Sequence, residues 1–171
     1  MKLKPEFRPE PFKPAPLEQP MTSIAELMTH DHRACDHDFA RAETLADCGQ
    51  WEEADQALAA FADALNAHFD AEEQTLFPAF EAATGMTQGP TEVMRGEHRD
   101  MREILERLQE ALSARDADEF AGEAETLMIM MQQHNMKEEN ILYPMCDARL
   151  GTEQASVCSS LGAALNQENR A

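Results

Sequence analysis

The sequence predicts an all-α fold, an antiparallel up-down-up-down four-helix bundle with an extended N-terminal arm and a short C-terminal helix. Two observations predict the bundle. Apolar residues recur at the spacing of three and four that is typical of bundle cores, and capping or turn residues divide the chain into four long segments. No segment carries the alternating pattern of a β-strand. At 171 residues, the chain is long enough for one domain with a proper core.

The first two helices are defined by their start and stop signals. A capping box formed by Ser23 and Glu26 opens the first helix, which ends before Gly49. The second helix starts just after this glycine. We expect it to break or kink at Pro78, because a proline inside a helix removes a hydrogen-bond donor.

The third and fourth helices follow in the same way. Pro90 suits a first helical position, and the third helix runs from there to about residue 114. Asp116 then caps a fourth helix that continues to about Tyr143. Its apolar stripe includes Ile141, which we therefore expect in the core.

The chain divides into three parts. Residues 1–20 hold six of the nine prolines, which favours an extended arm. Its basic residues could lie against the acidic body, or the arm could be a mobile tail. Residues 21–150 form the bundle, and residues 151–171 form the short last helix and tail.

Composition excludes several classes of partner. The net charge of −19 argues against nucleic acid. No apolar run is long enough for a membrane span, and no secretory signal is visible, so we expect a cytoplasmic protein. The four cysteines lack metal-finger spacing and are expected to be free thiols. Nothing in the sequence identifies a protein partner.

Two stretches of the chain repeat the same set of metal-ligating residues at an offset of 66 residues. Each stretch contains a single histidine, then a His-x-x-x-Glu motif, then an aromatic residue followed by proline. The first set is His32, His68 and Glu72 with Phe77-Pro78, and the second is His98, His134 and Glu138 with Tyr143-Pro144. Four of the six histidines in one register exceed what composition supplies.

All six repeated residues lie on the apolar stripes of their helices. His32 lies 17 residues before Gly49 and His68 lies 19 after it, so both stand about 25–28 Å from that turn. The second set flanks a turn near Arg115 with the same spacings. The four histidines can therefore form one layer across the bundle, with the glutamates one turn away.

Burying six such groups without a partner would cost several kcal/mol or more. A positive charge among them removes this cost, and two glutamates shared by two ions would leave two histidines for each ion. Nitrogen and oxygen ligands without thiolate suit iron, manganese or zinc. With octahedral ions and a bridging oxygen, about one position on each ion stays open for a small gas or peroxide.

The order His, His-x-x-x-Glu, His, His-x-x-x-Glu, with its Phe-Pro and Tyr-Pro tails, resembles the hemerythrin-like (HHE cation-binding) family over residues 22 to about 150. The arm and the last helix are also similar to hemerythrin architecture. The resemblance implies a four-helix bundle with a non-haem di-iron centre. It gives His32, His68, His98 and His134 as terminal ligands, and Glu72 and Glu138 as bridges.

One position departs from the family's oxygen carriers, which have another histidine one turn beyond the single histidine on the third helix. That position is Arg102 here, which weakens the oxygen-carrier interpretation. Asp36 occupies the equivalent place on the first helix. We therefore expect Asp36 and Arg102 to pair beside the site.

Several neighbouring residues have alternative interpretations. Glu73 and Glu139 replace Glu72 and Glu138 if the helices rotate. Cys35 lies one turn from His32 and is expected to pack rather than to act as a redox thiol. Tyr143 matches Phe77 in the repeat, so a packing role is expected for it as well.

The favoured function is a metal-binding protein that takes up or senses dioxygen or nitric oxide, rather than an enzyme. One alternative is a di-iron peroxidase or oxidase that uses the same centre. Another is iron storage or delivery, including repair of iron–sulfur centres. The related repair proteins carry a cysteine-bearing N-terminal segment, whereas this arm has no cysteine before Cys35.

Overall fold

The structure of the protein is a computed structural model that describes residues 22–168. The arm predicted for residues 1–20 lies outside these residues. The described part of the chain is helical and contains no strand, which confirms the all-α prediction. The division of the chain into three parts stays a prediction.

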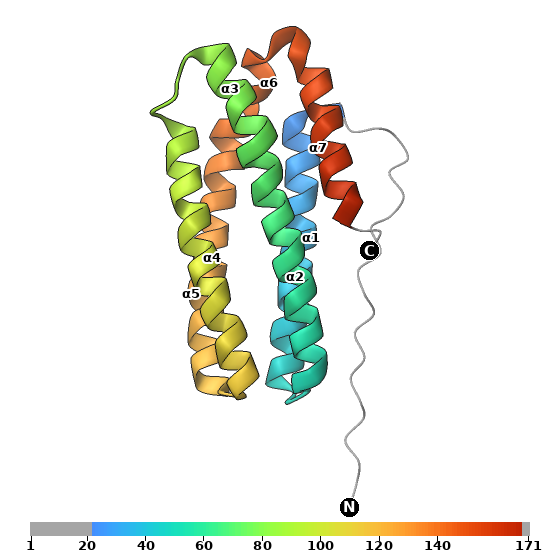
Figure 1. Ribbon diagram of the computed structural model, residues 1–171, viewed down its shortest axis with the longest axis vertical. Coiled ribbons are helices and arrows are strands. Elements are labelled where there is room, and N and C mark those ends of the chain that lie inside the picture. Colours follow the sequence, from blue (N-terminus) through green and yellow to red (C-terminus); the bar gives the residue numbers. More distant parts are fainter. Residues whose placement is uncertain (1–21, 169–171) are drawn as a thin grey trace, which may run out of the picture.

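Four long helices form the body of the described part of the chain (Figure 1). They pack as two neighbouring pairs, α1 with α2 and α4 with α5. In addition, α2 contacts α4 and α1 contacts α5, so that α1 and α4 lie at opposite corners of the bundle. The bounds are α1 Ile24–Asp47, α2 Trp51–Ala71, α4 Pro90–Ala114 and α5 Ala117–Lys137.

The start of α1 is capped twice. The Ser23 hydroxyl accepts a hydrogen bond from the Glu26 N–H, as the capping box predicts. Asp147, from the other end of the chain, accepts hydrogen bonds from the N–H groups of Ile24 and Ala25 at 2.9 and 3.1 Å. A carboxylate at this end of a helix is also favoured by the helix dipole.

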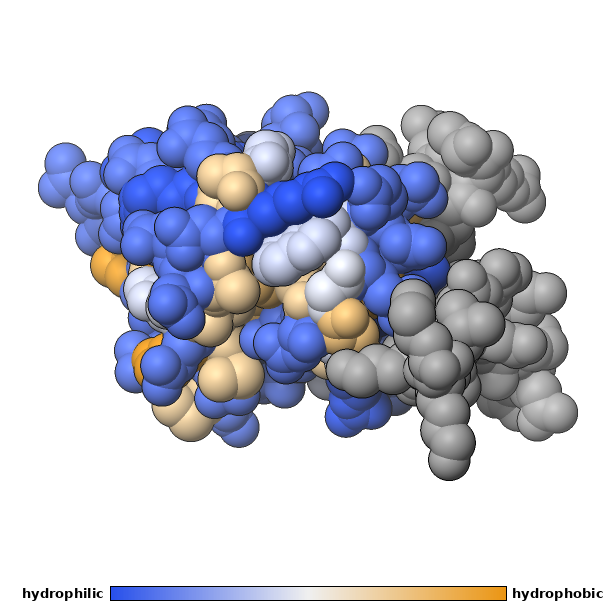
Figure 2. Space-filling view, turned by 90° about the horizontal axis from the view of Figure 1, so that it is seen from below, coloured by the Kyte–Doolittle hydropathy of each residue, from blue (hydrophilic) through white to orange (hydrophobic). Residues whose placement is uncertain are grey.

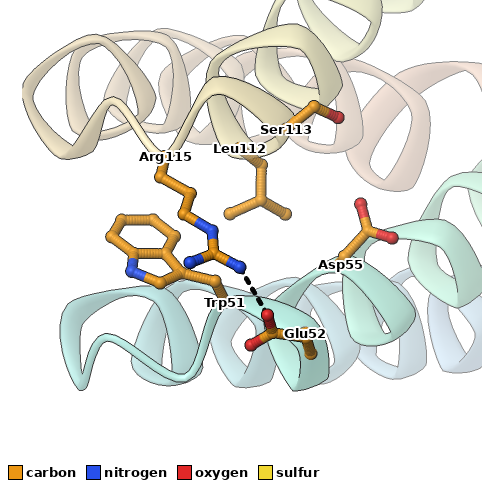
Figure 3. Close-up of a pocket in the computed structure, with 6 residues that line it drawn as sticks. All are labelled: Trp51, Glu52, Asp55, Leu112, Ser113 and Arg115. Carbon is orange, nitrogen blue, oxygen red and sulfur yellow. Dashed lines mark hydrogen bonds and ion pairs between the residues drawn. The ribbon is translucent and has the colours of Figure 1, made fainter.

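The chain reverses direction at Gly49 and at Arg115, where φ is 70° and 55°. Both turns lie at one end of the bundle, whose surface is mainly hydrophilic around a small paler patch (Figure 2). Arg115 extends beside the Trp51 ring and donates a hydrogen bond to Glu52 (Figure 3). This contact links the two pairs of helices at the rim of an open surface pocket.

The second and fourth helices each widen into a π-helical turn before they continue. These turns are Glu72–Leu76, followed by α3 Phe77–Thr84, and Glu138–Leu142, followed by α6 Tyr143–Arg149. The residue that follows each turn donates its backbone N–H to the carbonyl oxygen five residues earlier, as Phe77 does to Glu72. A proline follows directly and cannot bond four residues back. The second helix therefore widens before Pro78 rather than ending there.

The π turn shifts the register of the following residues by one. Ile141, predicted in the core, is 55% exposed, whereas Leu142 is only 2% exposed. In an uninterrupted α-helix, Ile141 would lie on the same face as Glu138. The wider turn carries it to the surface, so the prediction for Ile141 is wrong.

Two apolar clusters fill the bundle on either side of the histidine level. One includes Phe61, Leu65 and Leu108 and extends toward the turns. The other includes Met28 and Phe80, and α7 Gln154–Glu168 contributes to it by packing against α1 and α2 (Figure 1). A short 3-10 turn, Gly151–Glu153, precedes α7. Among residues 22–168, no helix combines the length and apolar character needed to cross a membrane.

We predict that Asp147→Ala lowers the free energy of unfolding by about 1–2 kcal/mol, because two N–H groups of α1 lose their acceptor. Urea denaturation followed by circular dichroism measures this change. Asp100→Ala removes the same charge from an exposed position on α4 and should cost less than about 0.5 kcal/mol. Equal losses in both variants would contradict the capping role.

Candidate metal centre

The structure brings together all six residues of the sequence repeat, one histidine from each long helix and one glutamate from each π turn. Each is at most 4% exposed. Their donor atoms form two groups that share Glu138, and within each group the atoms lie within 4.8 Å of one another. The groups are Glu72, His98, His134 and Glu138, and His32, His68 and Glu138.

The four imidazoles form two equivalent pairs. The Nε2 atoms of His32 and His68 are 3.1 Å apart, and those of His98 and His134 are also 3.1 Å apart. Each pair comes from two helices joined by one of the turns, so the sequence repeat is also a repeat in space.

The two glutamates connect these pairs. Glu138 lies with Oε2 3.2 Å from the Nε2 of His32 and with Oε1 3.1 Å from the Nε2 of His134. One carboxylate therefore spans both imidazole pairs. Glu72 Oε2 lies 3.2 Å from the Nε2 of His98 and 3.5 Å from that of His68.

The polar atoms at the centre match the requirements of bound cations. Among the described residues, Glu72 Oε2 and Glu138 Oε1 are buried and accept no hydrogen bond. An unpaired buried carboxylate oxygen is costly. Two facing imidazole lone pairs at 3.1 Å also repel unless a proton or a metal ion lies between them. The residues present therefore fit metal ions bound by nitrogen and oxygen.

A carboxylate accepts a hydrogen bond from the outer nitrogen of each imidazole. The four Nδ1–oxygen distances are 2.7 or 2.8 Å. This contact places the proton on Nδ1 and turns the Nε2 lone pair toward the centre, as in metal-binding histidines. The pairs are His32 with Glu139, His68 with Asp31, His98 with Glu73, and His134 with Glu97.

Glu73 and Glu139 thus lie outside the centre and do not take the places of Glu72 and Glu138. Asp31 and Glu97 play the same part, although the sequence analysis missed them. They lie one residue before the single histidines and are themselves 66 residues apart. The repeat offset could therefore have identified them.

The expected ion pair between Asp36 and Arg102 is wrong. Arg102 lies on α4 and donates to Glu73 at 2.9 Å, with further hydrogen bonds to Asn66 and Asp70 on the neighbouring helix α2. Asp36 lies on α1, at the opposite corner of the bundle from α4. The diagonal separation prevents the pairing that repeat symmetry suggested.

Two cations make the surroundings of the imidazole pairs unequal. Arg102 pairs with Glu73, behind His98, and Lys137 pairs with Glu97, behind His134. These contacts hold the pKa of both carboxyls below the usual value despite partial burial. The repeat equivalents of Arg102 and Lys137 are Asp36 and Ala71.

The carboxylates behind the other imidazole pair have no such neutralisation. In the described part of the chain, Asp31 and Glu139 form no ion pair with lysine or arginine. Asp36 adds another acidic group nearby, and burial together with Glu139 raises its pKa. The His32 and His68 side of the centre is therefore the more negative one.

The carboxylates of the centre also control the titration of the imidazoles. Burial alone would lower the pKa of His32, but Glu138, Glu139 and Glu72 outweigh it and raise the value. The pKa values of His68 and His134 are raised in the same way. Burial would raise the pKa of Glu138, but His134 and His32 hold it well below the usual range. The cluster therefore attracts positive charge.

Tyr143 contributes more than the packing role predicted for it. Its hydroxyl lies 2.7 Å from Glu72 Oε1, 2.9 Å from Glu138 Oε2 and 3.1 Å from the Nε2 of His32. The π turn explains this position, because its wider winding stacks residues five apart, such as Glu138 and Tyr143. Burial and both glutamates raise the pKa of Tyr143 well above its ordinary value.

Two further residues near the first histidine are not part of the donor cluster. Cys35 is buried, and burial together with nearby aspartates raises its pKa well above the ordinary value. The thiol stays protonated, which suits a packing residue. His37 is largely exposed and lies 3.5 Å from Asp38. Among the described residues, none of the four cysteines forms a disulfide.

The fold and the buried histidine–glutamate cluster together define a helical cation-binding domain. A family model described as the hemerythrin HHE cation binding domain matches residues 23–146. This match covers most of the chain, and the chain belongs to the hemerythrin HHE cation-binding family. Comparisons with curated proteins and with solved structures found no match.

The raised histidine pKa values predict the pH dependence of the metal-free protein. Protonated imidazoles add stability that is fully present below the unfolded value of 6.5 and is lost as pH rises through the folded values. The free energy of unfolding of chelator-treated protein should therefore fall as pH rises above 6.5. Urea titrations in EDTA measure it.

Metal-loaded protein provides the comparison for this experiment. Metal ions require deprotonated imidazoles, so the stability gained on adding metal should grow over the same pH range. Stability of the chelator-treated protein that stays constant or rises above pH 6.5 would contradict the prediction.

Proposed function

We propose that this protein is an up-down-up-down four-helix bundle that holds two non-haem iron ions and binds or senses dioxygen or nitric oxide. The observation that carries the proposal is the two buried imidazole pairs joined by Glu138 and Glu72. Among the described residues, Glu138 Oε1 and Glu72 Oε2 accept no hydrogen bond. Manganese or zinc would accept the same donors.

The proposed ligand set follows the distances between donor atoms. His32 and His68 would hold one ion, His98 and His134 would hold the other, and both glutamates would be shared. The carboxylates at the Nδ1 atoms hold the rings in place, so that the Nε2 atoms need no rearrangement to bind.

Bound iron supplies a redox-active Lewis acid that can take a small ligand at an open position. The protein supplies the surroundings of that position. Met28, Met94 and Met101, each about one helical turn from a proposed histidine ligand, are buried, which favours exclusion of bulk water from the centre. The apolar clusters on both sides favour a small, weakly polar ligand over a large polar substrate.

Two alternative functions use the same centre. The peroxidase or oxidase alternative is favoured by the Tyr143 phenol, an oxidisable group in contact with both glutamates. Iron storage or delivery is less favoured, because the proposed ligands are almost fully buried and release requires the bundle to open.

The metal proposal predicts about two iron ions per chain in protein from iron-replete cells, measured by elemental analysis. His68→Ala should lose most of this metal. Asp31→Asn should weaken metal binding by about 10–100-fold, because the Nδ1–H of His68 loses its charged acceptor. Asp38→Asn, which removes a carboxylate that lies 3.5 Å from His37 and outside the donor cluster, should bind metal normally. Protein from iron-replete cells that contains no transition metal would contradict the proposal.

The choice between binding and turnover is tested by absorption spectroscopy of iron-loaded protein. Oxygen or nitric oxide added to iron-loaded protein that was prepared anaerobically should give a stable adduct that is reversed by purging with inert gas. Steady consumption of hydrogen peroxide without such an adduct favours the enzyme alternative. Transfer of iron to an apo acceptor protein favours delivery.

A further inference from the structure

Tyr143 gives the two proposed ion positions different surroundings. We infer that its phenolate oxygen is a seventh protein ligand, bound to the ion held by His32 and His68, and that the other ion keeps the open position. This inference rests on the proposed metal site and specifies how that site is divided.

The distances around the Tyr143 oxygen are those between adjacent ligands of one metal ion. Metal–ligand bonds of about 2.1 Å at right angles place neighbouring donor atoms about 3.0 Å apart. The oxygen lies 2.7 Å from Glu72 Oε1, 2.9 Å from Glu138 Oε2 and 3.1 Å from the Nε2 of His32. The corresponding distances are 3.2 Å between His32 and Glu138, and 3.1 Å between His32 and His68. The tyrosine oxygen therefore fits the same coordination shell.

The equivalent place beside the other ion contains no oxygen. Phe77 occupies it, stacked near His98 with 5.8 Å between ring centroids and 20° between ring planes. Both aromatic residues are fully buried directly after a π turn. The two sides therefore differ by one hydroxyl group at one repeat position.

The surrounding charges divide the centre in the same way. Arg102 and Lys137 neutralise the carboxylates behind His98 and His134. In the part of the chain that the structure describes, no lysine or arginine pairs with the carboxylates behind His32 and His68. More negative surroundings stabilise a more highly charged ion, and a phenolate is a hard, anionic ligand suited to trivalent iron. The Tyr143 oxygen and the distribution of surrounding charges therefore both favour Fe(III) at the position between His32 and His68.

Binding of Tyr143 to the ion is a proton loss without electron transfer. The phenol O–H bond breaks, a bond between oxygen and Fe(III) forms, and the proton leaves to bulk water. The charge of a bound ion stabilises the phenolate.

Resonance Raman and visible absorption spectra of Fe(III)-loaded protein test the inference. Tyr143 is the only tyrosine in the chain, so phenolate ring modes enhanced within a visible charge-transfer band can come from no other residue. The wild-type protein should show both signals, and Tyr143→Phe should lose both while retaining about two iron ions per chain.

Phe77→Tyr is the matched variant, because it places a phenol at the equivalent position beside the other ion. It should add a second set of phenolate modes. Azide then counts the open positions by absorption titration. We expect about one azide per wild-type centre, about two for Tyr143→Phe and none for Phe77→Tyr.

The outcomes separate this inference from the proposed metal site. Protein that loads two iron ions but shows no phenolate modes overturns the role of Tyr143 alone. Protein that loads no iron overturns both proposals. The wild-type spectrum tests whether Tyr143 binds iron even if Tyr143→Phe fails to fold.

Discussion

The structure depends on the burial of ionisable groups in the middle of a bundle core. Four imidazoles and two carboxylates occupy a level that Leu or Phe would otherwise fill, and they are at most 4% exposed. Such groups are tolerated only with compensating charge. Four carboxylates accept hydrogen bonds from the outer nitrogens of the rings. Two of these carboxylates pair in turn with Arg102 and Lys137, so that the pairing of charges extends from the centre toward the surface. This arrangement explains why polar residues beyond the six central ones are also paired at the repeat offset.

The π turns provide the second constraint. An α-helix of uniform pitch would present Glu138 to the centre and direct Tyr143 elsewhere. The wider turn before Pro144 lets both side chains reach the same point. The same turn moves Ile141 to the surface and Leu142 to the core. One local change in winding therefore determines the chemistry of the centre and the packing of the helix that follows.

Sequence reasoning was sufficient where the α-helical period of 3.6 residues holds. The repeat and the apolar stripes identified the all-α fold and the six clustered residues. The same reasoning failed for Ile141 and Tyr143, because a π turn adds a residue that periodicity does not reveal. It also failed for the partner of Arg102, since the sequence does not state which helices are neighbours and which are diagonal. Asp31 and Glu97 could have been predicted from the sequence, because they also lie 66 residues apart.

Each half of the repeat carries two imidazoles and one carboxylate, and Glu138 of the second half reaches His32 of the first. Neither half by itself therefore contains a complete centre. A shorter chain that carried only one half would need a second copy, related by a twofold axis, to assemble the same six groups. Joining both halves in one chain removes that symmetry requirement. It allows one copy to have Phe77 where the other has Tyr143, and Asp36 where the other has Arg102, which no homodimer of identical chains can achieve.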